Sequence, residues 1–440
     1  DPMVLDKSDA RRRSMMTTRT LLVALLINAW FNFLPDAAGL QRCRVTAFFS
    51  SVSRTLKAAS RHSTKRTLPA RSRINARSLQ ALTDDSVPSP TSQDYEIKHY
   101  HHKGWKISYR YQPASPGYET FTPIVFIHPV GIGLASWFWN RMFASASAAA
   151  STANDNGGHP ELYAVDLIGC GLKLGADGWD PQARGLFFPK SWADGIRTLW
   201  KAEIQRPCVL VVQGAVTPVG IALAVNDDVT VDGATFDGSY AIDSLVFASP
   251  PIYDDLSSAI PEAELSFNYN VWSNPIVSSV VFGVFEQRSI IRFFSNMFLF
   301  EEKCDEEWLD YAMEEATCNT LTREPVKAFN TGLLNHVSYE TELQTIMQTV
   351  ICLCGTGDRR TEKRKRYETE MRNCRIQTIR GGNVLPWENP TETLEIIKSL
   401  CRDTATAADG SNRKRISFSL KDKIEPVLKQ WLEGQDNQFE

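Results

Sequence analysis

The chain has 440 residues, of which 43% are hydrophobic, with 25 Gly and 22 Pro. This composition excludes a disordered chain, a collagen-like chain and a small disulfide scaffold, and the length suits one large domain or two ordinary ones. The net charge is −3, but residues 1–82 hold 15 Lys or Arg and 4 Asp or Glu, so residues 83–440 carry a net charge of −14, which argues against nucleic acid as a partner.

The nine cysteines are scattered along the chain, and no two of them form a Cys-x-x-Cys pair. An odd count without metal-ligand spacing argues against a zinc site and against a secreted disulfide framework. We therefore expect reduced, mostly buried thiols, and neither a metal nor another cofactor. Cys352 and Cys354 are two residues apart on a predicted strand, so we expect both to face the same side and pack in the core.

The amino-terminal segment has the composition of a targeting sequence. Arg11, Arg12, Arg13 and Arg19 precede an apolar run at residues 21–34. A basic stretch followed by 14 apolar residues has the proportions of a signal peptide, and the run is shorter than the roughly 20 residues of a membrane span. A signal anchor that stays in a membrane, and secretion, are the alternatives.

A second part of the predicted targeting sequence follows the apolar run. Small residues at 45–47 suit cleavage, Phe48 and Phe49 come next, and residues 41–80 contain ten Arg or Lys without any Asp or Glu. That is the composition of a transit peptide. The two parts together resemble the presequence of algae with complex plastids, so the sequence predicts a plastid (chloroplast) protein with a targeting presequence over 1–82. Residues 83–95 are predicted to be a linker.

From residue 95 onward, short apolar runs alternate with segments of helical pattern. Residues 98–111 alternate polar and apolar side chains, which predicts a half-buried hairpin. Near-continuous apolar runs, ended by Gly, Pro or Asp, predict parallel strands buried on both faces. These runs are residues 124–128, 162–167, 208–212, 245–248 and 350–353, with a weaker run at 375–379. The pattern predicts an α/β domain with helices on both faces of a sheet.

An aromatic insert interrupts this alternation. Between Pro250 and His336 no strand pattern occurs, and the segment contains 13 aromatic residues. We expect a helical lid at 251–340 over the carboxyl ends of the strands, where open α/β sheets bind ligands. The alternative is the ordinary core of a helical subdomain. The lid would divide the α/β core into a first part, 96–250, and a second part, 341–440, which ends in a polar loop at 402–423 and a helix at 425–432.

Five segments resemble α/β-hydrolase motifs and stand in the order of that superfamily. Residues 123–143 resemble its third strand and oxyanion loop, and residues 165–171 its Asp-x-x-Gly-x-Gly turn. Residues 207–224 stand where the nucleophile elbow belongs, residues 352–358 resemble the strand that delivers the acid, and residues 380–390 resemble the histidine loop. The resemblance implies a mostly parallel eight-stranded sheet with a helical lid. It is strongest to hydrolase-like proteins of cyanobacteria and plastids whose catalytic triad is degenerate.

The elbow lacks a nucleophile in every alignment. The superfamily places Ser in a sharp Gly-x-Ser-x-Gly turn between strand and helix. Depending on the alignment, the nucleophile position here holds Gly214, Ala215 or Val216, none of which has a nucleophilic atom. Thr217 carries the nearest hydroxyl, and because it precedes Pro218 we expect it to be a helix N-cap followed by Pro at the first helical position.

The other two triad positions are also altered. Asn383 stands at the histidine position and cannot act as a general base near neutral pH. The last histidine of the chain is His336, ahead of Asp358 at the acid position, so the order nucleophile, acid, histidine cannot be completed. We expect His336 to be structural or exposed. Asp358 keeps the acid position, and we expect it to cap a helix or to pair with Arg359 or Arg360.

Three further residues are candidates for a pocket or oxyanion loop. His128 and Pro129 replace the usual His-Gly, and Pro129 removes one backbone N–H donor from that loop. We expect His128 to be a buried hydrogen-bonding residue. Cys170, between two glycines near the strand ends, is expected to be a small buried residue, because no base stands beside it in the sequence.

These observations favour a plastid α/β-hydrolase-fold protein that no longer hydrolyses and instead binds an apolar small molecule or a protein partner. A lipid, pigment or isoprenoid would suit an aromatic lining. The alternative is an active ester or lipid hydrolase that uses Thr217, His128 or Cys170 in a rearranged site. A third hypothesis is a scaffold with a collapsed pocket, which the volume of the site would distinguish from a ligand-binding protein.

Overall fold

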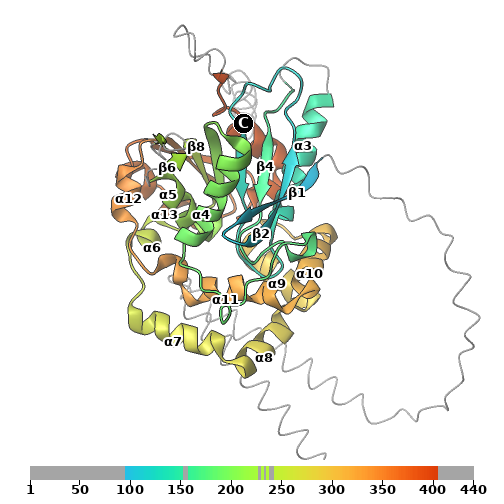
Figure 1. The fold of residues 1–440 in the computed structure, drawn as a ribbon, viewed down its shortest axis with the longest axis vertical. Helices are drawn as coiled ribbons and strands as arrows, with labels where there is room; N and C mark the ends of the chain where they lie inside the picture. The colour runs from blue at the N-terminus through green and yellow to red at the C-terminus, as the bar shows by residue number, and fades with distance from the viewer. Residues whose placement is uncertain (1–94, 152–156, 226–228, 232–233, 237–241, 405–440) are drawn as a thin grey trace, which may run out of the picture. The chain divides into compact units, whose positions relative to one another are not determined.

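The computed structural model describes residues 95–404, except 152–156, 226–228, 232–233 and 237–241 (Figure 1). The predicted presequence and linker lie outside the described residues except Tyr95, and so does the predicted carboxyl-terminal segment beyond residue 404. The described residues within 93–275 and 284–440 form one compact unit, and residues 276–283 fall in a second unit. The following description concerns the first unit unless stated.

One eight-stranded sheet, in the order β1-β2-β4-β3-β5-β8-β9-β10, forms the centre of this unit. Strands β1 and β2 form an antiparallel hairpin, β2 is antiparallel to β4, and all other neighbours are parallel. The strands are β1 (Glu96–His102), β2 (Trp105–Gln112), β3 (Ile124–Ile127), β4 (Leu162–Val165), β5 (Cys208–Gln213), β8 (Ile242–Ala248), β9 (Thr349–Gly355) and β10 (Cys374–Ile379). The predicted hairpin and all six predicted runs are confirmed as strands.

A short hairpin was not predicted. Strands β6 (Val229–Val231) and β7 (Ala234–Phe236) pair antiparallel between α5 and β8. Each has only three residues, too short to show a clear period of two in the sequence.

Helices cover both faces of the sheet. Helices α3 (Asn140–Ser151) and α16 (Pro390–Lys398) contribute to the apolar core on one face. Helices α4 (Lys190–Leu199) and α5 (Thr217–Ala224) contact each other on the opposite face (Figure 1). A Cβ at Gly220 would lie 2.6 Å from Val212, so the absence of a side chain there lets α5 lie directly on β5.

The strands between the two helix layers are apolar on both faces because both faces are covered. The shorter elements that connect them are η1 (Ser136–Trp139), η2 (Leu172–Leu174), the π-helix η3 (Trp200–Ile204), η4 (Gly214–Val216), α13 (Thr361–Arg364), α14 (Arg366–Glu370) and α15 (Leu385–Glu388). Most of them lie just after a strand, so they shape the loops at the strand ends.

The segment between β8 and β9 is helical, as predicted. It consists of α6 (Tyr253–Ser257), α7 (Glu262–Ser273), α8 (Pro275–Phe285), α9 (Arg288–Phe294), the π-helix η6 (Ser295–Leu299), α10 (Glu306–Cys318), η7 (Thr320–Thr322), α11 (Arg323–Thr331), η8 (Leu333–Asn335) and α12 (Glu340–Thr345). Residues 276–283 belong to α8. None of the helices in the described residues has the length and hydrophobicity needed to cross a bilayer.

Candidate functional site

The parallel strands end at one edge of the sheet, and the loops that follow β3, β4, β5, β9 and β10 contain every residue predicted for the site except His336. In open α/β sheets this edge is where ligands bind. The elbow after β5 and the loops after β9 and β10 occupy one half of the edge, and the loops after β3 and β4 occupy the other.

The turn between β5 and α5 is tight and left-handed at its first residue. Gly214 follows β5 directly and has φ +65°, whereas Val216 has φ −85°. A Cβ at Gly214 would meet only the Cβ of Pro129, at 4.0 Å. Of the three candidate positions, Gly214 therefore combines the unusual backbone conformation with open space for a side chain.

Thr217 closes this turn. It is the first residue of α5, and its buried hydroxyl donates to the carbonyl oxygen of Gly214 over 2.7 Å. The prediction that Thr217 is the N-cap is wrong, because Val216 holds that position and Pro218 is the second helical residue. The hydroxyl donates backwards to a carbonyl, so it does not accept from the helix amides as a capping side chain does.

The elbow is tied to the loop that holds Asn383. The side-chain amide of Gln213 donates to the backbone carbonyl oxygen of Asn383 over 2.7 Å, and the backbone N–H of Asn383 donates to the carbonyl of Leu299 over 2.6 Å. The structure thus brings the predicted nucleophile and histidine positions together. The contact between them is made by a glutamine side chain and a backbone carbonyl, two groups without acid–base function near neutral pH.

Asp358 is engaged in a partly buried ion pair. Its Oδ2 lies 2.6 Å from Nη1 of Arg364, and its Oδ1 accepts the backbone N–H of Arg360 over 2.9 Å. Arg364 is only 1% exposed and also donates from Nε to the carbonyl of Pro250. The predicted partner Arg360 bonds to Asp358 only through its backbone N–H, and the ion-pair partner is Arg364, which was not predicted.

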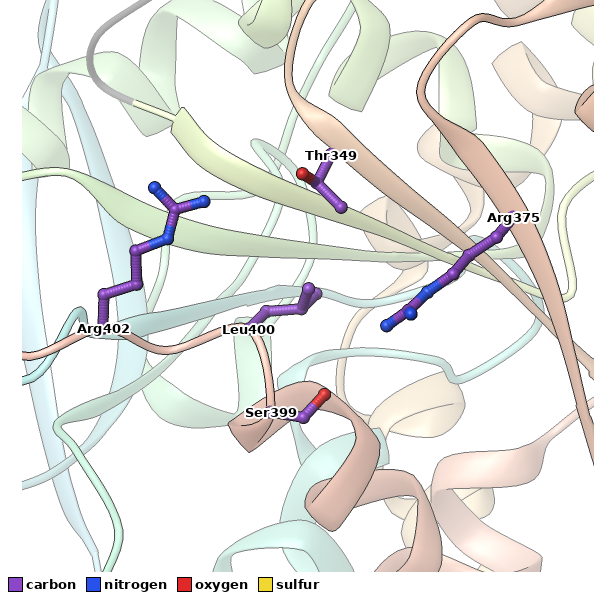
Figure 2. Close-up of a pocket in the computed structure, with 5 residues that line it drawn as sticks. All are labelled: Thr349, Arg375, Ser399, Leu400 and Arg402. Atoms are coloured by element: carbon purple, nitrogen blue, oxygen red, sulfur yellow. The ribbon is translucent and has the colours of Figure 1, made fainter. Parts of the chain in front are cut away.

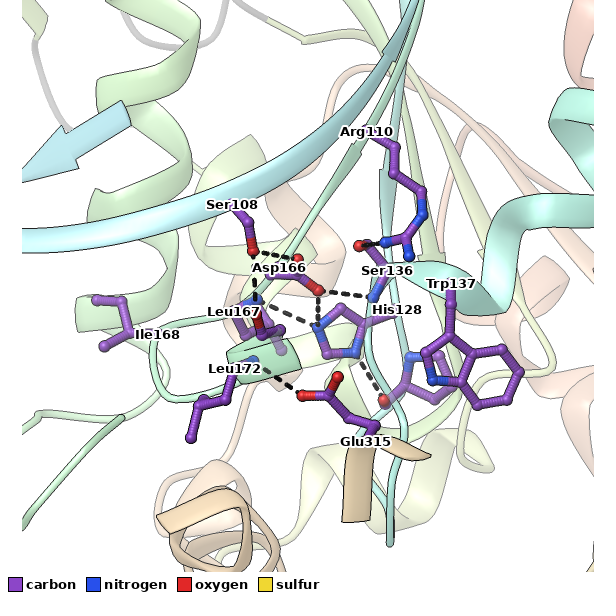
Figure 3. A network of polar contacts seen from close by, with 12 residues as sticks. Ser108, Arg110, His128, Ser136, Trp137, Asp166, Leu167, Ile168, Leu172 and Glu315 are labelled. Carbon is purple, nitrogen blue, oxygen red and sulfur yellow. Dashed lines mark hydrogen bonds and ion pairs between the residues drawn. The ribbon is translucent and has the colours of Figure 1, made fainter. Parts of the chain in front are cut away.

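In the other half of the edge, His128 and Asp166 form the centre of a buried polar network (Figure 3). His128 Nδ1 donates to the carbonyl of Pro129 over 2.8 Å, and its Nε2 accepts the backbone N–H of Leu167 over 3.1 Å. A carbonyl can only accept and an amide can only donate, so these partners fix one neutral tautomer. Burial lowers the pKa of His128, although Asp166 lies 3.9 Å away and opposes that shift. His128 is buried and hydrogen-bonded, as predicted.

The carboxylate of Asp166 accepts two short hydrogen bonds. Its Oδ1 accepts the backbone N–H of Ser136 and its Oδ2 accepts the hydroxyl of Ser108, each over 2.6 Å. The guanidinium of Arg110 donates to the Ser136 hydroxyl. Asp166 thus holds the start of η1, after β3, against β2.

Glu315 brings the helical insert into this network (Figure 3). It lies on α10, is 4% exposed and accepts the backbone N–H of Leu172 over 2.9 Å. Burial, together with the nearby charge of Asp166, raises the pKa of Glu315 to about 7. The same two causes raise the pKa of the Cys170 thiol well above its ordinary value, so Cys170 is a buried neutral thiol, as predicted.

Aromatic side chains fill the space where α10 meets the strand ends. Trp137 in η1 packs on Trp308, Tyr311 and Trp387 with ring centroids 5.1, 5.2 and 5.5 Å apart, and the three tryptophans are at most 2% exposed. At Gly133 a Cβ would lie 1.9 Å from the backbone oxygen of Ala312. Helix α10 therefore packs directly on the loop after β3 and leaves no room for a further side chain there.

Sequence comparisons with protein-family models and with curated proteins gave no match. Solved structures do match. A serine hydrolase involved in carbazole degradation, the CarC enzyme, is 13% identical, with a TM-score of 0.50 over 70% of this chain and 98% of that one. An esterase from Thermogutta terrifontis (14% identical, TM-score 0.48, 69% and 96% covered) and the haloalkane dehalogenase DatA from Agrobacterium tumefaciens C58 (16%, 0.47, 70% and 100%) are also similar. The strand order and the first of these matches identify the architecture. The chain has the α/β-hydrolase fold.

Within the α/β-hydrolase fold of this chain, one predicted candidate lies apart from the strand-end loops. His336 is exposed and bonds through Nδ1 to the carbonyl of Leu333. Three polar residues of the site were missed: Asp166, Glu315 and Arg364. Asp166 stands in the quoted Asp-x-x-Gly-x-Gly motif, which was a usable signal. Glu315 and Arg364 reach their partners from separate helices, so no local sequence pattern marks them.

Proposed function

We propose that this α/β-hydrolase-fold protein does not hydrolyse esters and acts by binding. The observation that carries the proposal is the elbow itself. Gly214, which follows β5 in a left-handed backbone conformation, has no side chain. The hydroxyl of Thr217 is hydrogen-bonded to the Gly214 carbonyl. A turn without a nucleophilic atom cannot form the covalent intermediate of a serine hydrolase.

The other two positions support the same proposal. Asp358 is paired with Arg364, and Asn383 contributes only its backbone carbonyl to the elbow. The rearranged alternative loses support for a related reason. Both ring nitrogens of His128 already have partners, and the thiol of Cys170 is buried with a raised pKa, so neither residue is a ready base or nucleophile.

We further propose that the bound partner is a protein rather than an apolar small molecule. Buried tryptophans fill the strand ends beneath α10, where a ligand of the lipid, pigment or isoprenoid class would otherwise lie. In contrast, Phe267 and Tyr269 on α7 are 63% and 49% exposed. Exposed aromatic side chains on one helix are typical of a surface that binds another protein. Plastid location remains part of the proposal, on the composition of residues 1–82.

Turnover by the purified full chain tests this proposal. The substrates are p-nitrophenyl esters with short to long acyl chains, and Thr217→Ala and Asp358→Asn variants are measured alongside. We expect no turnover above the variants and the uncatalysed rate, because no side chain can form an acyl-enzyme. Turnover that either variant abolishes would overturn the proposal and support the active-hydrolase alternative.

A further inference from the structure

A small cavity lies at the amino-terminal edge of the sheet, away from the elbow. Its volume is about 90 Å³, and it is lined by Thr349, Arg375, Ser399, Leu400 and Arg402 (Figure 2). Thr349 opens β9 and Arg375 is the second residue of β10, while the other three residues follow α16. Because β9 and β10 run parallel to the strands that end at the elbow, their first residues lie at the opposite edge.

Two arginines line the cavity, and in the described residues only one of them has an ion-pair partner. Arg402 pairs with Asp243 on β8, with 3.1 Å between Nη1 and Oδ1. Within the described residues, the guanidinium of Arg375 has neither an ion pair nor a hydrogen bond. Glu395 on α16 pairs with Lys398 over 3.3 Å. Among the described residues, two guanidinium groups therefore line one cavity, and only that of Arg402 has a carboxylate partner, Asp243, an arrangement that an anion would stabilise.

Both arginines stand on fixed backbone. The amide of Arg402 donates to the hydroxyl of Thr122 over 2.7 Å, and its carbonyl accepts the Thr122 amide over 2.9 Å. Arg375 lies opposite Ile351 in the parallel pairing of β10 with β9. Figure 2 shows Arg375 extending toward Leu400 and Ser399, with Thr349 above the space and Arg402 on the far side of Leu400, its guanidinium turned away from Arg375. Both side chains therefore start from ordered backbone, which lowers the entropic cost of binding a common ligand.

We propose that this cavity binds a tetrahedral oxyanion, phosphate or sulfate, between Arg375 and Arg402. The planar fork of a guanidinium donates two parallel hydrogen bonds to such an anion. The Thr349 hydroxyl, which has no partner within the described residues, donates a further bond. Ser399 already donates to the carbonyl of Ile396 over 2.6 Å, so it is a wall of the site and not a donor. The volume equals that of about three water molecules, which suits one free anion or the phosphate group of a larger molecule.

Titration calorimetry of the full chain with inorganic phosphate, at constant ionic strength set by chloride, tests the site. We expect saturable binding of one phosphate per chain. Arg375→Ala should weaken it by about 10- to 100-fold, because charge-assisted hydrogen bonds are lost, and Arg375→Lys should weaken it less. The matched control is Arg380→Ala, at the other end of the same strand, where Arg380 is exposed and pairs with Glu302. This control should bind phosphate like the parent chain.

Three results would overturn the site: no saturable binding, equal loss in the Arg375→Ala and Arg380→Ala variants, or equal affinity for chloride and phosphate. Titration with glycerol 2-phosphate distinguishes the sources of the anion. Tighter binding of inorganic phosphate assigns the site to free oxyanion, and tighter binding of the ester assigns it to a phosphorylated molecule, provided that each depends on Arg375. The site is distant from the elbow, so its test is independent of the proposed function.

Discussion

The two halves of the edge at which the strands end differ in the polar residues that they carry. After β3 and β4, the polar residues His128, Asp166 and Glu315 remain, and all of them are buried and bonded. After β5, β9 and β10, the predicted nucleophile, acid and histidine positions hold Gly214, the ion-paired Asp358 and Asn383. Under the proposed function, the edge lacks reactive groups but keeps its structural hydrogen bonds, because these bonds hold the loops in place whether or not a reaction occurs.

The greatest loss of stability is expected from removing the carboxylate of Asp166. Asp166→Ala leaves the backbone N–H of Ser136 and the hydroxyl of Ser108 buried without their charged acceptor. We expect the free energy of unfolding to fall by about 5 kcal/mol, since each such bond contributes roughly 1.5–3 kcal/mol. Urea denaturation measures the change. Asp177→Ala, which removes an exposed acceptor of the Lys106 amide, is the control, and an equally large loss there would contradict the special role of Asp166.

The next effect tests whether Asp358 is structural. Arg364→Met should lower stability by about 4 kcal/mol, because it leaves Asp358 and the Pro250 carbonyl without a buried partner. A double-mutant cycle with Asp358→Asn should give a coupling energy of about 1–3 kcal/mol. A coupling energy near zero would mean that the pair does not hold the loop, and Asp358 would again be open to another role.

The protonation of Glu315 is expected to make the free energy of unfolding depend on pH. The folded chain keeps the Glu315 proton up to a pKa of about 7, whereas the unfolded chain releases it near the ordinary value of 4.5. Between these values the folded state binds more protons, so stability falls as pH rises, by about 3 kcal/mol in total. Glu315→Gln should remove this loss and be more stable than the parent chain at pH 8. Denaturation midpoints from pH 4 to 8 measure the effect.

Glu314→Gln is the control for that series, because Glu314 is exposed on the same helix and pairs with Lys173. Its stability should follow the pH profile of the parent chain. A flat profile for the parent chain, or a Glu315→Gln variant that is less stable at pH 8, would contradict the assigned protonation of Glu315.

The smallest effect concerns the elbow. Thr217→Val keeps the shape of the side chain and removes the hydrogen bond to the Gly214 carbonyl, so we expect a loss of about 1 kcal/mol. Thr317→Val, which removes a similar but exposed bond to Met313, should change stability less. A loss of ester turnover in Thr217→Val without any loss of stability would show that the hydroxyl is reactive and not structural.

The fold could be predicted because it depends on local patterns. Buried parallel strands are continuous apolar runs, so residues 124–127 and 350–353 were found directly from the sequence. The identity of the residues at the elbow was also readable. Their contacts were not, because the partner of Asp358 depends on which face of a short helix Arg364 occupies. Glu315 is separated from Leu172 by 143 positions, and only the packing of α10 on the strand ends brings them together.

If the elbow has no nucleophile, no side chain there should attack an acyl or phosphonyl group. The full chain is incubated with a fluorophosphonate and, separately, with excess p-nitrophenyl acetate, and its intact mass is then measured. We expect no fluorophosphonate adduct, and we expect any slow acetylation to map to surface lysines. A stoichiometric adduct that peptide mapping places on Thr217, Cys170 or Asp358 would contradict it.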